Sequence, residues 1–124
     1  MIFVFGSNES GIHGAGAAHA AYHGHGARLG QGFGYAGNSF AIPTKDWKIQ
    51  TLPMAVIEQY INRFVVFARF NPEHKFQVTA LGCGLAGLKH RDIAPLFKYA
   101  PPNCKFDELW KEFLPQKLYW GTHP

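Results

Sequence analysis

Two glycine-rich segments, each directly after an apolar run, have the residue types best suited to binding an anion. The first run, Ile2–Phe5, leads into Gly6-Ser7-Asn8 and an alanine-rich stretch over residues 11–18. The second run, Phe76–Leu81, leads into Gly82–Leu88. Glycine permits positive φ and close approach of a ligand, and free N–H groups at a helix N-terminus attract negative charge. The pair predicts a backbone site for phosphate groups; the alternative is that the glycines only form tight turns.

Two titratable residues lie close enough to these segments to take part in chemistry. Lys45 follows Pro43-Thr44 at the end of an expected strand, and His13 stands inside the first glycine-rich segment. Lys45 is either a phosphate or ribose contact, a nucleophile, or a solvated loop lysine. His13 can hydrogen-bond a phosphate or ribose hydroxyl, act as a base, or open the helix without touching a ligand.

The remaining candidates for metal or thiol chemistry are weaker. Cys83 lies in the second segment, but no histidine partner is identifiable, so we interpret it as a packed thiol rather than a nucleophile. His19 and His23 are four residues apart, yet no carboxylate accompanies them and no zinc spacing is present. We therefore expect surface histidines, and the sequence predicts no metal and no other cofactor.

The order of expected elements favours an α/β fold with a mainly parallel sheet covered on both faces. Apolar runs predict strands over residues 2–5, 39–42, 76–81 and 117–120, the second ended by Pro43. Helices are expected over residues 13–28, from Thr51-Leu52-Pro53 to just before Pro72, from Asp92 as N-cap, and over 106–113. Parallel strands place their carboxyl ends at one edge, so the two glycine-rich segments should face each other across a crevice.

Length and composition predict a single globular domain. The chain has 124 residues, of which 47% are hydrophobic and 16% charged, a balance typical of a compact core and not of disorder. No apolar stretch is long enough to cross a bilayer, and two cysteines make no disulfide framework. We expect a cytoplasmic protein without a membrane partner.

The charge distribution favours an anionic partner. The formal net charge is +4, and before Thr44 the only acidic residue is Glu9. A nucleotide, phosphate or nucleic acid would suit this field, although slight basicity alone marks no ligand. Nucleic-acid binding stays an alternative, with lysines and arginines scattered rather than clustered on one element. A nicotinamide-dependent oxidoreductase ranks last because the G-x-G-x-x-G spacing is missing.

Three segments resemble the macrodomain superfamily. Gly6-Ser7-Asn8 with Gly14–Ala18 resembles the first ligand loop of macrodomains, in which an asparagine follows the strand and a glycine run precedes a helix. Phe40–Lys45 resembles the strand and lysine of the terminal ADP-ribose glycohydrolase branch, and Leu81–Leu88 resembles the diphosphate loop of that branch. In this order the segments cover roughly residues 2–99, and the last is the most specific.

The resemblance implies a three-layer α/β/α macro-like fold that binds ADP-ribose or a related nucleotide, with an ADP-ribosylated macromolecule as a further partner. Asn8 would lie near the distal ribose, and Lys45 would match the lysine that attacks its anomeric carbon. Such a lysine must first be deprotonated, because the ammonium form has no lone pair. The residues assigned to ligand contact are Gly6, Ser7, Asn8, Gly14, Ala15, Gly16, Ala17, Thr44, Gly82, Cys83, Gly84, Leu85, Ala86 and Gly87.

Two departures from the family pattern bear on catalysis and on base recognition. Ala86 stands where the hydrolytic branch carries a catalytic aspartate, so Asp92 or Asp46 would have to replace it. The strands that usually precede the first ligand loop, with an aspartate that contacts adenine, do not precede Ile2. The catalytic candidates are Lys45, His13 and Asp92. The sequence leaves open whether the chain hydrolyses an ADP-ribosyl bond or is a non-catalytic reader.

Overall fold

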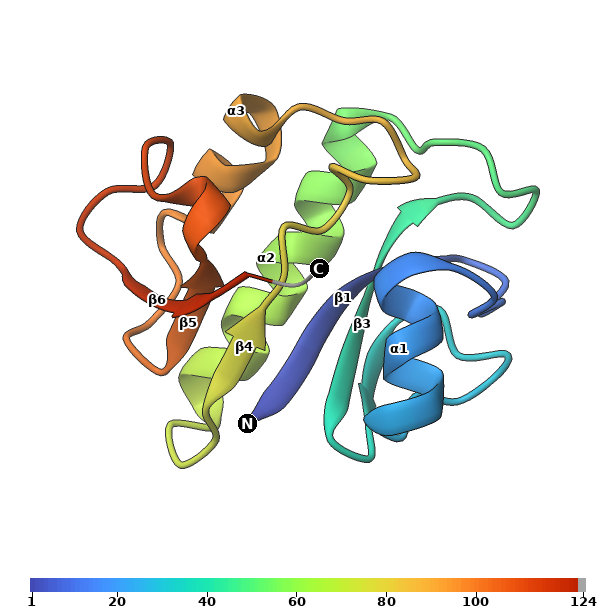
Figure 1. The fold of residues 1–124 in the computed structure, drawn as a ribbon, viewed down its shortest axis with the longest axis horizontal. Coiled ribbons are helices and arrows are strands. Elements are labelled where there is room, and N and C mark those ends of the chain that lie inside the picture. Colours follow the sequence, from blue (N-terminus) through green and yellow to red (C-terminus); the bar gives the residue numbers. More distant parts are fainter. Residues whose placement is uncertain (123–124) are drawn as a thin grey trace.

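The computed structural model describes residues 1–122 and contains a six-stranded sheet with helices on both faces (Figure 1). The strands are β1 Ile2–Asn8, β2 Gly34–Ala36, β3 Ser39–Lys45, β4 Phe76–Val78, β5 Cys104–Asp107 and β6 Leu118–Gly121. The helices are α1 Gly16–Gly24, α2 Met54–Phe70 and α3 His90–Ile93, with 3₁₀ turns η1 Ala94–Phe97 and η2 Glu108–Trp110. The expected three-layer α/β/α arrangement is confirmed.

The sheet has the order β2-β3-β1-β4-β5-β6, and every neighbouring pair is parallel except β2 with β3. The carboxyl ends of β3, β1, β4 and β5 therefore lie side by side along one edge, the upper edge in Figure 1. Both glycine-rich segments leave the sheet at this edge, as the parallel topology predicted.

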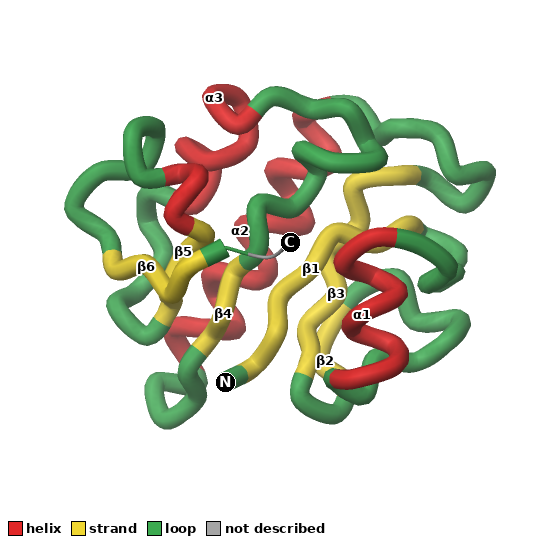
Figure 2. Tube along the Cα trace, in the orientation of Figure 1, coloured by secondary structure: helices red, strands yellow, loops and turns green. Residues whose placement is uncertain are grey.

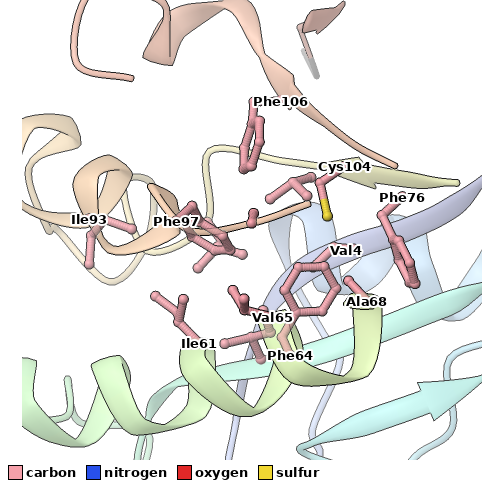
Figure 3. Close-up of a cluster of buried hydrophobic side chains, with 14 of the residues drawn as sticks. Val4, Ile61, Phe64, Val65, Ala68, Phe76, Ile93, Phe97, Cys104 and Phe106 are labelled. Atoms are coloured by element: carbon pink, nitrogen blue, oxygen red, sulfur yellow. The ribbon is translucent and has the colours of Figure 1, made fainter. Parts of the chain in front are cut away.

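One face of the sheet is covered by α2, and the other by α1 (Figure 2). Five apolar residues of α2 recur at helical spacing and are buried: Ile57, Ile61, Phe64, Val65 and Ala68. They face rings from the sheet and from η1, among them Phe76, Phe97 and Phe106 (Figure 3). The predicted helix between Pro53 and Pro72 is thus confirmed, because its apolar stripe has a complementary aromatic surface to cover.

The α1 face has a much smaller core. Phe3 and Phe5 of β1 pack with alanines, of which Ala18 and Ala21 come from α1. Side chains this short let the helix axis lie close to the sheet.

Several expected elements differ from the structure. The helix expected over residues 13–28 is only α1, because Ala15 is extended at φ −151° and Gly26 takes φ +76°. The strand expected to end at Pro43 continues to Lys45, with the register slipping after the Ser7–Pro43 pair. A proline has no N–H for the ladder, and the irregularity there accommodates it.

The largest correction concerns the segment expected to be a helix over residues 106–113. It begins as strand β5, in which Cys104 and Phe106 are buried at alternate positions, and only then turns into η2. Asp92 is also not an N-cap: the helix begins one residue after Lys89, with Asp92 in its first turn. The strand predicted over 76–81 pairs only as far as Val78.

Candidate functional site

A cleft of about 600 Å³ opens at the carboxyl edge of the sheet, between the two glycine-rich segments. This volume is within the range of small-molecule sites. Its lining contains Lys45 and every residue assigned to ligand contact from the sequence except Gly87. His13 and Asp92 are not part of the lining.

The first loop is braced from within by Asn8. The Asn8 side chain accepts hydrogen bonds from Ile12 N at 2.9 Å and Ser10 Oγ at 2.8 Å, and donates through Nδ2 to Ile12 O at 2.8 Å. These bonds close the turn that carries the chain from β1 to α1. One Nδ2 hydrogen is left, so any contact of Asn8 with a ligand is limited to that donor.

The N-terminus of α1 faces the cleft without a cap. Its N-cap residue is Ala15, which makes no side-chain cap bond, and the first turn has no acidic residue. Within residues 1–122, the amides of Gly14 to Ala18 donate to no protein acceptor. Uncapped amides at a helix N-terminus bind anions.

The second loop presents another set of free amides. It is held by Leu88 N donating to Gly82 O at 2.9 Å and Gly87 N donating to Gly84 O at 3.0 Å. Between these bonds, the amides of Gly84, Leu85 and Ala86 have no protein acceptor in the described part of the chain. Consecutive unpaired amides in a turn form an anion-binding concavity.

The two loops approach each other over the cleft. A Cβ placed on Gly16 would lie 3.5 Å from Leu85 Cδ1, so the leucine side chain of the second loop lies close to the start of α1. The first loop is supported from behind by Gly32, where a Cβ would meet Asn8 O at 2.2 Å. Only glycine at position 32 permits its backbone to approach that of Asn8 so closely.

Lys45 is half-buried at the end of β3 and lines the cleft. No carboxylate of the described residues lies within 4.0 Å of its ammonium group. Asp46 is engaged elsewhere, since its Oδ1 accepts from Lys48 N at 2.8 Å and Gln50 N at 2.9 Å. Asp92 is exposed outside the cleft lining. Neither aspartate therefore takes the place of the carboxylate that Ala86 lacks.

His13 requires a correction. It does not open α1; it precedes the helix by three residues and is only 3% exposed. Its Nε2 lies 2.8 Å from Arg28 O, and its ring meets Phe5 edge-on at 5.4 Å between centroids. The imidazole thus joins the first loop to the chain after α1 and is not part of the cleft lining.

Cys83 lines the cleft as an unreactive thiol. Burial raises its pKa to about 11, against a smaller lowering by the Trp110 indole N–H. The thiolate is the nucleophilic form, so this cysteine stays protonated near neutral pH.

The lining also includes residues that the sequence did not suggest, chiefly Asp107 and His90 at the β5 end. Asp107 Oδ1 accepts from Leu109 N at 2.9 Å, and its Oδ2 accepts from Thr122 Oγ1 at 3.1 Å. Trp110 Nε1 donates to His90 Nδ1 at 3.0 Å, which leaves the proton of the neutral ring on Nε2. Asp107 would have been found had the alternation of Cys104 and Phe106 been interpreted as a strand whose end reaches the cleft.

Comparisons with protein-family models, curated proteins and solved structures returned no significant match. The likeness to macrodomains therefore rests on the three sequence segments described above. Among the described residues, no group of three or more His, Cys, Asp or Glu side chains is placed to hold a metal ion. Across the same residues, no helix has the length and apolar character to traverse a membrane.

Proposed function

We propose that this chain binds ADP-ribose or a closely related nucleotide in the cleft, with the diphosphate between the two loops. The observation that carries the proposal is the pair of facing amide sets, residues 14–18 and 84–86, none of which has a protein acceptor in the described chain. A single set would suit one phosphate or sulfate. Two sets across one cleft suit two linked phosphates.

The positive charge at the Lys45 and α1 side of the cleft supports the same ligand class, while the Asp107 carboxylate lies at the β5 end and is bonded to Leu109 N and Thr122 Oγ1. Lys45 brings a positive charge that no carboxylate within 4.0 Å neutralises among the described residues, and the α1 dipole adds a partial positive charge. The family resemblance of the loops and of Lys45 points to ADP-ribose among diphosphates.

Hydrolysis of an ADP-ribosyl bond is the second candidate, because Lys45 lies in the same cleft and matches the lysine of the hydrolytic branch. Binding ranks first, because attack by the Lys45 amine requires removal of a proton and neither Asp46 nor Asp92 is placed to help. The chain then acts as a reader of ADP-ribose.

Calorimetry with ADP-ribose, ADP, AMP, NAD and inorganic phosphate tests the binding proposal. We expect measurable affinity for ADP-ribose and ADP and little for AMP or phosphate, since only a diphosphate reaches both amide sets. Absence of ADP-ribose binding would contradict the proposal. Strongly salt-dependent binding of an oligonucleotide would then favour the nucleic-acid alternative.

Glycine substitutions with open space around the new side chain locate the site. Positions 14, 84 and 24 have no atom within 4 Å of an added Cβ, and only the first two line the cleft. We expect Gly14→Asp and Gly84→Asp to weaken ADP-ribose binding by about tenfold or more, through repulsion of the phosphates. Gly84→Ala keeps the amide and should bind within about threefold, and Gly24→Asp is the control for added charge.

Lys45→Ala separates reader from hydrolase. A reader keeps most of its ADP-ribose affinity and releases no ADP-ribose from a modified protein, with or without Lys45. Release by the parent protein that disappears in Lys45→Ala would establish the second candidate instead.

A further inference from the structure

The loop between β3 and α2 holds one residue in an unfavourable backbone conformation at the cleft mouth. Ile49 has φ +65° and lines the cleft beside Lys45. The turn that contains it is tightly bonded: Ile49 N donates to Asp46 O at 3.1 Å, and Asp46 N donates to Gln50 O at 2.7 Å. The hairpin therefore imposes the left-handed conformation on position 49.

An isoleucine is poorly suited to this position. The left-handed region favours glycine or asparagine, and a β-branched residue there is an outlier. Burial in the core does not offset the strain, because Ile49 is 42% exposed. In contrast, Ile42, Ile57, Ile61 and Ile93 are all 0% exposed.

The position of Ile49 along the sheet edge indicates which part of a ligand its side chain would contact. The amide sets follow β1 and β4, the two central strands of the sheet, so a diphosphate between them occupies the middle of the cleft. The cleft lining continues from there toward the end of β5 on one side and the end of β3 on the other, so we place one substituent of the diphosphate at each end. At the β3 end, the lining combines the Lys45 ammonium with the apolar side chain of Ile49.

We propose that Ile49 packs against the sugar ring attached to the diphosphate at the β3 end, and so selects a nucleoside diphosphate sugar over a nucleoside diphosphate. This inference rests on the proposed ADP-ribose site. The C–H face of a furanose is apolar and its hydroxyls are polar, which suits an aliphatic wall beside a cationic one. The strained conformation is retained because it aims an aliphatic side chain at the cleft.

The test compares ADP-ribose with ADP, which lacks the second sugar, in calorimetric titrations of three proteins. In Ile49→Gly we expect ADP-ribose affinity to fall about fivefold, as for loss of roughly 40 Å² of apolar contact, and ADP affinity to change less than about twofold. Gln116→Gly is the matched control. Gln116 is the other non-glycine residue with positive φ in the described chain, at φ +66°, and it lies outside this cleft. It should leave both affinities unchanged.

Each outcome bears on one of the two proposals. Unchanged ADP-ribose affinity in Ile49→Gly, or an equal loss for both ligands, overturns the role of Ile49 while the diphosphate site stands. If the parent protein binds ADP-ribose no better than ADP, the role of Ile49 is also overturned while the diphosphate site stands. Binding of neither ligand by the parent protein removes the proposed function, and this inference with it. Ile49→Asn, which also tolerates positive φ, repeats the comparison if the glycine variant fails to fold.

Discussion

The two faces of the sheet are packed by side chains of different size. The α2 face packs rings against rings: Phe64 lies 5.1 Å from Phe40, 5.2 Å from Phe76 and 6.1 Å from Phe97 between centroids. On the α1 face, the Phe3 and Phe5 rings of β1 pack against alanines, with Ala21 fully buried against the sheet. The core on the α2 face therefore contains many large side chains, whereas the core on the α1 face is small.

This difference between the faces indicates that the α2 face mainly determines stability, whereas the α1 face mainly affects ligand binding. Most buried apolar surface, and so most of the hydrophobic free energy, lies on the α2 face. The alanines of the α1 face contribute little, but they let α1 lie close enough to β1 for its uncapped N-terminus to line the cleft. Variants on the two faces should therefore have different consequences.

The largest effect is expected from Phe64→Ala on the α2 face. Removing a fully buried ring should lower the free energy of unfolding by about 3–5 kcal/mol, measured by urea denaturation. ADP-ribose affinity of the folded fraction should stay within about twofold. Phe64→Leu serves the binding measurement if the alanine variant is too unstable. A large affinity loss in Phe64→Leu would break the separation of the two faces.

Compared with Phe64→Ala, the variant Ala21→Leu on the α1 face should lower the free energy of unfolding less and the ADP-ribose affinity more. Overpacking there should destabilise by about 1–3 kcal/mol and move α1 off the sheet. Because the amides of its first turn move with it, we expect ADP-ribose affinity to fall about tenfold. Ala55→Leu, the same change at an exposed position of α2, is the control. Unaltered binding in Ala21→Leu would show that close packing of α1 is unnecessary.

The smallest effects are expected when glycine replaces the two strained residues, Ile49 inside the cleft and Gln116 outside it. Gln116→Gly should raise the free energy of unfolding by about 1 kcal/mol, because glycine adopts the left-handed conformation without steric cost. Ile49→Gly should also raise the free energy of unfolding, because the strain is removed there too. Thermal unfolding measures both. A destabilised Gln116→Gly would mean that the backbone there is not strained.

The sequence was most reliable where a local pattern and its packing agree. The helical stripe from Ile57 to Ala68 predicted α2, and the parallel topology brought the two glycine-rich segments to one edge. Prediction failed where a short pattern fits two structures: the segment expected to be a helix over residues 106–113 is the end of strand β5 followed by the 3₁₀ turn η2.

The site shows the same division. The sequence itself identified Lys45, from its place after the expected strand, and the two glycine-rich loops, because glycines directly after an apolar strand permit the positive φ and the close approach that an anion-binding turn requires. Only the tertiary structure buried His13 away from the cleft, brought Asp107 and His90 to its β5 end, and placed the strained Ile49 at its β3 end. Those placements depend on contacts between residues far apart in the chain, such as His13 with Arg28 and His90 with Trp110, which no local pattern encodes.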